Sequence, residues 1–452
     1  MKEALKVGVS GVRGVVGESF TPQIAAGFAQ AFGTFVGQGP VLVGRDTRPS
    51  GLMLQYAVVA GLQSVGCSPV LLGVVPTPTV LLMTKHRGAR GGIAITASHN
   101  AAKWNALKFA DRNGLFLEES RAQELFDVYH QQDFPLVEEA ALPAVSCLSN
   151  PIEQHFKQVL DYVDVAAIRA RRFRVAVDCV NGVGALFSTQ FLRDHLGCEV
   201  VSLNDEPTGI FAREPEPLAE HIGGLCEAVV KNTCDIGFAQ DPDGDRLALV
   251  NERGEAIGED FTLAFVARQI LEAHEKGPVA ISLSTSRAVE DVVRSYHCEV
   301  IRTGIGETFV ARAMLRSSAV VGGEHTGGVI IPKIHPCRDS FGAMAVILEL
   351  LARTGKTVSE LRAEIPRYVV VRRKLPTRPE RAAEALREIR RLHAGRKMNL
   401  MDGLFIEFDQ AWAHIRRSNT EPVMRLMVEA PCEASANALI GELESQLTPL
   451  LD

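Results

Sequence analysis

The sequence predicts a four-domain α/β protein, in which three α/β domains with mixed, largely parallel sheets precede a smaller α+β domain. Its 452 residues exceed what one hydrophobic core holds, since domains usually have about 100–150 residues. Three stretches also repeat one pattern, in which a β-branched strand, a polar turn and an amphipathic helix precede a second strand. A spacing of about 20–25 residues between the strands is typical of a βαβ unit with a parallel pair. The three stretches are residues 41–72, 175–201 and 279–301.

Changes in composition place the domain boundaries. Prolines, acidic residues and small residues at 134–152 indicate a linker, a hairpin-like turn lies at 251–255, and Pro366 follows a long apolar helix. An alternating strand, a charged helix and a further strand come after this proline. The predicted domains are residues 1–150, 151–254, 255–366 and 367–452.

The composition predicts a soluble cytoplasmic protein. Apolar residues make up 46% and charged residues 23%, and the formal net charge is −6 with both signs spread along the chain. This balance argues against a nucleic-acid or membrane partner. The nine cysteines form no Cys-x-x-Cys pair, which is typical of reduced thiols. The start of the sequence does not resemble a signal peptide, and no apolar run reaches the roughly 20 residues needed to span a bilayer. The sequence does not distinguish a monomer from a homodimer.

A candidate nucleophile follows a short apolar strand. Residues 91–95 form this strand, and residues 96–100 follow it as Thr-Ala-Ser-His-Asn. Open α/β sheets bind ligands at the carboxyl ends of their strands, so Ser98 is placed for nucleophilic attack. Taken alone, the pentad fits a polar turn that caps the next helix better. The other motifs therefore have to decide.

The second motif is Asp-Pro-Asp-Gly-Asp-Arg at residues 241–246. Asp241, Asp243 and Asp245 would repel one another in this turn unless a cation lay among them. An EF-hand calcium loop would require glycine where Arg246 stands and helices on both sides, whereas apolar strands flank this turn. The same apolar flanks disagree with a solvated acidic turn. The motif therefore predicts bound Mg²⁺, which leaves positions open for water or phosphate oxygens.

Three stretches combine arginine with glycine or hydroxyl residues, as phosphate sites do. The first holds Ser10 and Arg13 near the amino terminus. The second spans residues 45–51, for which a capped turn is an equally good interpretation. The third places Arg416 and Arg425 within ten positions, among hydroxyl residues and a further arginine. Phosphate groups are thus the expected ligands.

Two loops carry groups suited to a sugar. Glu324 lies in a glycine-rich loop beside a hydroxyl residue, where it can accept hydrogen bonds from vicinal sugar hydroxyls. His325 is interpreted as a hydrogen-bonded loop residue, because a single histidine is a weak signal. The similar loop at 302–307 supplies Thr303 and Gly304 as candidate ligand contacts.

In this order, the motifs resemble those of the α-D-phosphohexomutase superfamily over the whole chain. The resemblance rests on residues 9–14, 96–100, 241–246, 323–324 and 416–425. It implies that Ser98 carries a phosphoryl group, that the phosphoserine and the three aspartates hold Mg²⁺, and that the last domain binds the phosphate that is not transferred. The implied sugar contacts are Glu324 and Thr326, and the implied phosphate contacts are Arg416, Ser418, Asn419, Thr420 and Arg425.

Two segments depart from the usual superfamily pattern. Residues 101–106 replace a proline and a Tyr-Asn-Gly sequence, although Lys108 matches the lysine that the family uses to assist proton transfer. The glycine-rich loop usually ends in Ser-Gly-His, whereas Gly328 ends it here. This ending, together with the Ser-Asn-Thr-Glu-Pro sequence at 418–422, resembles a branch of phosphoglucosamine mutases and phosphomannomutase/phosphoglucomutases.

The motifs together predict an isomerase that interconverts hexose 6-phosphate and hexose 1-phosphate by intramolecular phosphotransfer. Phosphorylated Ser98 would donate to a sugar hydroxyl with help from Mg²⁺, Arg13, Lys108 and Arg246, and hexose 1,6-bisphosphate would be the intermediate and activator. Glucosamine phosphate is the expected substrate, and mannose and glucose phosphates are the alternative. A Mg²⁺-dependent sugar phosphatase and an inactive sugar-phosphate-binding protein are further alternatives. The last domain is expected to close over the cleft through a hinge near Pro366.

Overall fold

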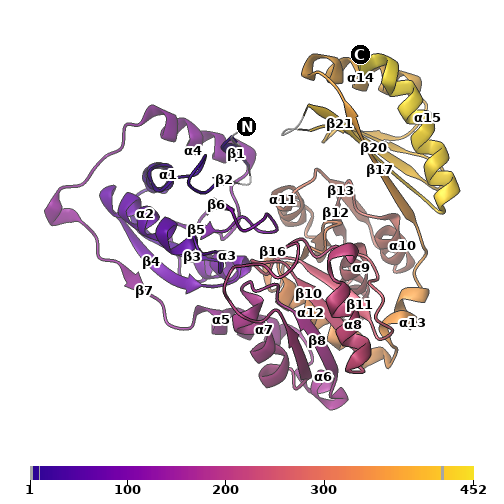
Figure 1. The fold of residues 1–452 in the computed structure, drawn as a ribbon, viewed down its shortest axis with the longest axis horizontal. Helices are drawn as coiled ribbons and strands as arrows, with labels where there is room; N and C mark the ends of the chain where they lie inside the picture. Colours follow the sequence, from indigo (N-terminus) through magenta and orange to yellow (C-terminus); the bar gives the residue numbers. More distant parts are fainter. Residues whose placement is uncertain (1–3, 10, 419–421, 452) are drawn as a thin grey trace.

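Three α/β domains pack around a common centre, and a fourth domain stands at the C-terminal end of the chain (Figure 1). The computed structural model describes residues 4–9, 11–418 and 422–451, apart from the side chain of Pro379. No helix in the described part of the chain has both the length and the apolar character needed to cross a bilayer.

The first domain is a mixed seven-stranded sheet with helices on both faces. Its elements are β1 (Lys6–Gly8), β2 (Gly11–Val15), α1 (Pro22–Val36), β3 (Gly39–Arg45), α2 (Gly51–Ser64), β4 (Cys67–Val74), α3 (Thr77–His86), β5 (Gly91–Ile95), β6 (Trp104–Ala110), α4 (Glu119–Gln131) and β7 (Ser146–Cys147). The strand order is β1-β2-β6-β5-β3-β4-β7, with β3 parallel to β4 and β5 and with β6 antiparallel to β5. Helices α1, α2 and α4 cover one face and α3 covers the other, each side through its own apolar cluster.

The second domain is a smaller sheet of four strands. Its elements are α5 (Pro151–Tyr162), α6 (Val165–Arg171), β8 (Arg174–Asp178), α7 (Gly184–Gln190), β9 (Glu199–Leu203), α8 (Gly223–Lys231), β10 (Ile236–Gln240) and β11 (Leu247–Asn251). Strand β8 lies parallel to β9 and β10, and β11 returns antiparallel to β10. The tight return from β10 to β11 is the Asp-rich turn, so both flanks of that turn are buried strands.

The third domain repeats this arrangement with five strands. Its elements are α9 (Asp260–Gln269), β12 (Val279–Ser282), α10 (Arg287–Ser295), β13 (Val300–Thr303), α11 (Glu307–Ser317), β14 (Val321–Gly323), β15 (Val329–Ile331), β16 (His335–Arg338), α12 (Ser340–Thr354) and α13 (Val358–Ala363). Strand β12 is parallel to β13 and β14, whereas β15 and β16 run antiparallel at the edge. The return from β14 to β15 is the glycine-rich loop.

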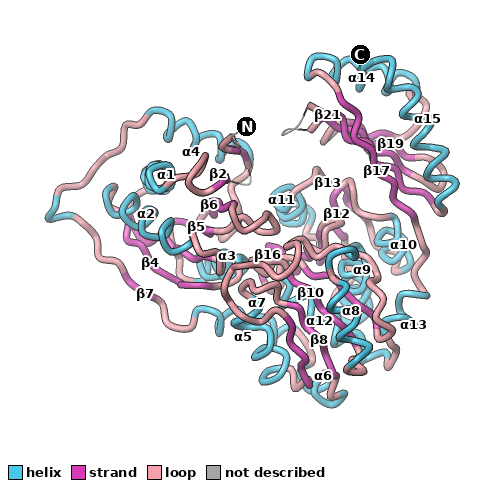
Figure 2. Tube along the Cα trace, in the orientation of Figure 1, coloured by secondary structure: helices cyan, strands magenta, loops and turns pink. Residues whose placement is uncertain are grey.

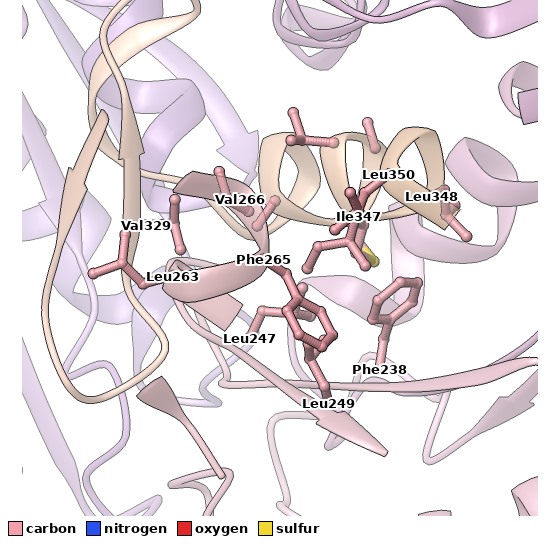
Figure 3. Packing of buried hydrophobic residues seen from close by; sticks show 14 of the residues in the cluster. Phe238, Leu247, Leu249, Leu263, Phe265, Val266, Val329, Ile347, Leu348 and Leu350 are labelled. Atoms are coloured by element: carbon pink, nitrogen blue, oxygen red, sulfur yellow. The ribbon is translucent and has the colours of Figure 1, made fainter. Parts of the chain in front are cut away.

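The second and third domains share one hydrophobic core (Figure 3). Phe238 of β10 and Leu249 of β11 belong to the same apolar cluster as Phe265 of α9 and Ile347 of α12. Helix α12 is the long apolar helix predicted from the sequence, and most of its residues are buried because it packs between the two domains. The shared core holds the Asp-rich turn and the glycine-rich loop at a fixed separation.

The fourth domain is an antiparallel sheet covered by two helices. Its elements are β17 (Val369–Pro376), α14 (Pro379–Leu392), β18 (Met398–Asn399), β19 (Leu404–Glu407), β20 (Trp412–Arg417), β21 (Val423–Ala430) and α15 (Glu433–Leu451). The strand order is β17-β21-β20-β19-β18, and every neighbouring pair is antiparallel. A small apolar cluster of Leu283, Phe405 and Trp412 joins this domain to the third.

The predicted fold class is confirmed. The three predicted βαβ units are the parallel pairs β3–β4, β8–β9 and β12–β13, each with a helix between its strands in the chain. Figure 2 shows β12 and β13 side by side as strands, with the helix α10 nearby. Antiparallel strands lie at the edges of all three sheets, so each sheet is mixed with a parallel centre. The carboxyl ends of these central strands meet where the four domains converge, which is where the predicted motifs lie.

Candidate active site

The serine loop leaves the carboxyl end of β5. Ser98 has a φ of 47°, a left-handed conformation that costs a non-glycine residue energy. Its backbone N–H donates to Oγ1 of Thr96 at 2.9 Å, and its Oγ donates to Oδ2 of Asp241 at 2.8 Å. The next regular element is strand β6, not a helix, so the capping interpretation of this pentad is wrong. The loop instead directs Ser98 toward the Asp-rich turn.

A fully buried arginine holds this loop in place. Arg48 donates from Nε to Oδ2 of Asp46 at 3.0 Å, and the same carboxylate oxygen accepts from Oγ1 of Thr96. The two terminal nitrogens of Arg48 donate to four backbone carbonyls at 2.6–2.9 Å. These carbonyls belong to Ser98, Asn100, Ala101 and Trp104. The segment at 45–51 therefore has a structural role here, and Arg48 also ties down the atypical residues after Asn100.

The three aspartates converge, as their spacing predicted. One carboxylate oxygen from each of Asp241, Asp243 and Asp245 lies within 4.8 Å of the others, and all three side chains are buried. Gly244 has a φ of +70°, which lets the chain turn tightly between the second and third aspartate. Oδ1 of Asp241 accepts from the backbone N–H groups of Asp245 and Arg246, which fixes the turn.

The electrostatics of this cluster fit a divalent cation. Burial, together with the neighbouring carboxylates of Asp245 and Asp243, raises the pKa of Asp241 well above its ordinary value. Oδ1 of Asp243 and Oδ1 of Asp245 are buried and have no hydrogen-bond partner among residues 4–9, 11–418 and 422–451. Buried oxygens of this kind normally have partners, and an ion of the Mg²⁺ type takes oxygen ligands. The donor set therefore fits Mg²⁺.

Three cationic side chains border Ser98 and the aspartates. Nζ of Lys108 lies 3.0 Å from Oδ2 of Asp243. Burial disfavours the positive charge of Lys108, but the adjacent carboxylates outweigh this effect, so the pKa of Lys108 lies above its ordinary value. Arg13 donates to Oδ1 of Asn100 at 3.1 Å, and Arg246 donates to Oε1 of Glu216 at 2.8 Å. All three of these side chains line the same cavity as Ser98.

The glycine-rich loop brings its acid to the same place. Oε1 of Glu324 accepts from the backbone N–H of Gly306 at 2.8 Å, which links the two loops predicted to read a sugar. Oγ1 of Thr326 is buried without a hydrogen-bond partner in the described part of the chain, so it is available to a ligand. His325 is hydrogen-bonded through Nδ1 to Oγ of Ser284 at 2.8 Å.

The fourth domain contributes a pair of arginines. Arg416 and Arg425 are directly opposite each other on β20 and β21, where like charges repel. Burial lowers the pKa of Arg416; the negative charge of Asp402 opposes this shift, and the positive charge of Arg425 adds a smaller lowering. The backbone N–H of Ser418, directly after β20, donates to the carbonyl of Val423 at the start of β21 at 2.9 Å. The predicted contacts Ser10, Asn419 and Thr420 lie outside the described residues.

A cavity of about 470 Å³ unites these groups. Seven of the predicted site residues line it, and the three aspartates lie behind them in contact with residues of the wall. The wall residues among them are Arg13, Ser98, Lys108, Arg246, Glu324, Thr326 and Arg416, and Asp241 contacts Ser98. Thr303 and Gly304 are not on the cavity wall; the residues that follow them, 305–309, are. The side chain of Thr303 is instead buried and donates to the carbonyl of Gly304.

Two charged residues of the wall were not singled out from the sequence. Glu307 begins α11, and Arg338 ends β16, and both reach the cavity. Glu307 lies at the end of the loop already predicted to contact a ligand, so its position beside Gly306 was a usable signal. Arg338 carries no such signal, because no motif surrounds it and its contacts come from loops far away in the chain.

The chain matches a known family in all four domains. Residues 4–136, 153–254 and 258–368 match alpha/beta/alpha domains I, II and III of phosphoglucomutase/phosphomannomutase, and residues 370–445 match its C-terminal domain. The chain belongs to this phosphohexomutase family. The superfamily predicted from the motifs is therefore confirmed, and so is an enzyme of the isomerase class that carries out intramolecular phosphotransfer on a hexose phosphate.

Individual relatives agree over nearly their full length. The chain is 38% identical to a "Probable phosphoglucosamine mutase" of Methanopyrus kandleri, covering 96% of each chain. It is 37% identical to a "Phosphoglucomutase/phosphomannomutase" of Thermococcus kodakarensis, covering 95% of each. Among solved structures, a phosphoglucomutase/phosphomannomutase family protein of Burkholderia thailandensis superimposes with a TM-score of 0.86 at 26% identity, covering 98% of this chain and 97% of that one. These family members differ in the sugar that their names specify.

Proposed function

We propose that this phosphohexomutase works through a phosphoserine at Ser98 and a hexose 1,6-bisphosphate intermediate, and that its preferred substrate is glucosamine phosphate. The contact of Ser98 Oγ with Asp241 Oδ2 at 2.8 Å, at the wall of the cavity of about 470 Å³, carries the proposal. A serine hydroxyl is a weak nucleophile and phosphoryl carrier unless nearby groups stabilise charge. The buried aspartates and the surrounding cations supply that environment.

Metal binding is part of the proposal. Asp241, Asp243 and Asp245, with phosphorylated Ser98, would hold Mg²⁺, on which the family depends. The unpartnered carboxylate oxygens support this assignment. Bound there, Mg²⁺ would offset the negative charge of the transferring phosphoryl group.

The proposed step exchanges one bond to phosphorus for another. A sugar hydroxyl oxygen bonds to the phosphorus of the phosphoserine while the bond from phosphorus to Ser98 Oγ breaks. The sugar hydroxyl loses its proton and Oγ gains one, so the free serine is restored. Arg13, Lys108 and Arg246 stabilise the charge on the phosphoryl oxygens. The reverse exchange with the other phosphate of the bisphosphate completes the isomerisation.

The fourth domain would bind the phosphate that is not being transferred. Arg416 lies on the cavity wall, and Arg425 faces it across the sheet. A phosphate held between two guanidinium groups would relieve their mutual repulsion. The bisphosphate intermediate has to reverse its orientation in the cavity between the two transfers. This phosphate site therefore has to bind either phosphate of the sugar. The distance between this phosphate site and Ser98 would be bridged by the hexose.

Glucosamine phosphate is favoured by charge and by relatives. The carboxylates of Glu307 and Glu324 line the cavity and would attract the protonated amino group of a hexosamine. The relative from Methanopyrus kandleri is named a probable phosphoglucosamine mutase. Mannose and glucose phosphates remain the second candidates, because the relative from Thermococcus kodakarensis is named for them.

Replacing Ser98 with alanine tests the mechanism. With a trace of hexose 1,6-bisphosphate in the assay, we expect the Ser98→Ala variant to lose mutase turnover by at least about 1,000-fold. Intact-mass measurement should find one phosphate on the wild-type protein and none on this variant. The matched control is Ser445→Ala on the exposed face of α15. Turnover near the wild-type rate in Ser98→Ala would contradict the proposal, and release of inorganic phosphate in place of isomerised sugar would indicate a phosphatase.

A substrate panel tests the sugar. We expect kcat/KM for glucosamine 6-phosphate to exceed the values for glucose, mannose and N-acetylglucosamine 6-phosphates by at least about tenfold. Equal values for glucose and glucosamine would contradict a role of the amino group. A preference for mannose or glucose would favour the second candidate.

A further inference from the structure

One guanidinium group contacts carboxylates from three separate segments. Nη2 of Arg338 donates to Oδ2 of Asp245 at 2.5 Å, and Nη1 donates to Oε2 of Glu324 at 3.0 Å. Nε lies 3.2 Å from Oε2 of Glu307, whose other oxygen accepts from the backbone N–H of Arg338 at 3.1 Å. Arg338 is only 9% exposed. It thus joins the Asp-rich turn, the glycine-rich loop and the start of α11.

The shape of the arginine side chain makes this threefold contact possible. The guanidinium is planar and points its N–H groups in fixed directions, so Glu324 and Asp245, which accept its two hydrogen bonds, are held at a defined angle to each other. Glu307 is held beside them by its ion pair with Nε and by the hydrogen bond from the backbone N–H of Arg338. A lysine ammonium at the same place would be a single point charge on a flexible stem. Burial strengthens these pairs and makes an unpaired carboxylate costly. The relative placement of Glu324 and Glu307 therefore depends on Arg338.

The glycine at 328 is explained by the same side chain. A Cβ atom at this position would lie 2.3 Å from Cδ and 3.1 Å from Cγ of Arg338, and the first distance is shorter than real Cβ contacts reach. The φ angle of Gly328 is outside the left-handed region, so its backbone conformation does not require glycine. The stem of Arg338 occupies the space in which a side chain at 328 would lie.

We propose that Arg338 is the positioning residue that sets Glu324 and Glu307, the sugar-facing carboxylates, against the metal-binding turn. Gly328 contributes to the same arrangement, because its lack of a side chain leaves room for the aliphatic part of Arg338. This inference rests on the proposed function, since it concerns the carboxylates that are placed to read the sugar. It goes beyond that function by assigning a task to two residues outside its catalytic groups.

A double-mutant cycle tests the proposal through activity. We expect Arg338→Ala to lower kcat/KM by about 100-fold. Arg338→Lys should lower it by about tenfold, because lysine keeps the positive charge but lacks the planar set of N–H donors of the guanidinium. Gly328→Ala should lower it by about tenfold, because its new methyl group displaces the arginine. The double variant Gly328→Ala with Arg338→Ala should be no worse than Arg338→Ala alone. The matched control is Gly441→Ala on α15, where an added Cβ meets no atom within 4 Å, and it should be unchanged.

Amide hydrogen exchange of the ligand-free protein gives a second readout that needs no activity. Residues 322–328 and 304–307 should exchange faster in Arg338→Ala and Gly328→Ala than in the wild type, and at wild-type rates in Gly441→Ala. If Arg338→Ala does not fold, Gly328→Ala and Arg338→Lys carry both measurements.

Three results would overturn the inference. These are wild-type activity in Gly328→Ala, effects that multiply independently in the double variant, and wild-type exchange of both loops in the folded variants. A wild-type protein that isomerises no sugar phosphate would refute the proposed function alone. In that case the exchange measurement would still decide whether Arg338 positions the loops.

Discussion

Oγ of Ser98 lies 2.8 Å from Oδ2 of Asp241, although the two residues are 143 positions apart in the chain. The first domain supplies the serine and the second supplies the aspartate, and each stands just after the carboxyl end of a strand. The contact forms because β5 and β10 end at the same junction between domains. Any group carried by the serine oxygen is therefore delivered directly to the three buried carboxylates.

Removing one carboxylate charge should abolish most activity without unfolding the protein. In Asp241→Asn, the amide oxygen can still accept from the backbone N–H groups of Asp245 and Arg246, so the turn should persist. We expect kcat to fall by at least about 100-fold and Mg²⁺ affinity by at least about tenfold, because one charged ligand is lost. Steady-state kinetics and calorimetric titration with Mg²⁺ measure these effects. Asp133→Asn, an exposed acid on the first domain, is the control; unchanged Mg²⁺ affinity in Asp241→Asn would contradict the metal assignment.

Removing the hydrogen bonds that hold the serine loop should lower kcat more than it changes KM. Arg48→Lys keeps a charge beside Asp46 but cannot reach four carbonyls at once. Leaving buried carbonyls without donors should cost about 2–4 kcal/mol of unfolding free energy and lower kcat by about 10–100-fold with little change in KM. Urea unfolding and steady-state kinetics test this expectation. A rise in KM at constant kcat would mean instead that Arg48 acts on substrate binding.

Removing a guanidinium from the fourth domain should weaken sugar-phosphate binding. We expect Arg416→Met to raise KM by about 10–100-fold, the size of one charge-assisted hydrogen bond to phosphate, and to leave the phosphate content of Ser98 unchanged. The control is Arg391→Met, an exposed residue on α14 that pairs with Glu388. Normal KM in Arg416→Met would show that this domain does not hold the second phosphate.

One buried carboxyl should make stability depend on pH. Burial raises the pKa of Asp260 to about 8, well above its ordinary value of 3.8. The folded protein therefore binds this proton more tightly than the unfolded chain, so the contribution is fully present at acid pH and is lost as pH rises from about 4 toward 8. Asp260→Asn keeps the acceptor for the backbone N–H of Ser286 and removes the titration.

Relative to the wild type, Asp260→Asn should gain unfolding free energy as pH rises, on the order of 3 kcal/mol between pH 5.5 and 8.5. Urea unfolding at the two pH values measures the difference, with Asp133→Asn as the control. Parallel behaviour of wild type and Asp260→Asn would contradict a raised pKa at this site.

The fourth domain should move when sugar phosphate binds. A short connection around Pro366 links α13 to β17, and a small apolar cluster that includes Leu283 and Trp412 packs the fourth domain against the third. Rotation about this connection would bring Arg416 toward Ser98. We expect small-angle scattering to record a smaller radius of gyration with saturating hexose 1,6-bisphosphate. Identical scattering with and without ligand would argue against closure.

Local sequence patterns were enough to predict the strands and the two main chemical motifs. The apolar runs before Ser98 and around the Asp-rich turn are buried strands, and their polar ends lie at the predicted edge of each sheet. The capping interpretation of the serine pentad failed because β6, and not a helix, follows it. Thr303 and Gly304 are not on the cavity wall, whereas the residues that follow them, from Ile305 to the start of α11, are.

The sequence by itself determined which residue types gather at strand ends, because strand periodicity and turn chemistry act over a few neighbouring positions. It thereby determined the family, the candidate phosphoryl carrier and the carboxylates that fit a metal. The tertiary structure alone decided the tasks of Arg48 and Arg338, each of which contacts segments many residues away. An arginine side chain is long and can donate hydrogen bonds to many kinds of acceptor. Only the packing of the domains decides which carbonyls or carboxylates lie within hydrogen-bonding distance of it.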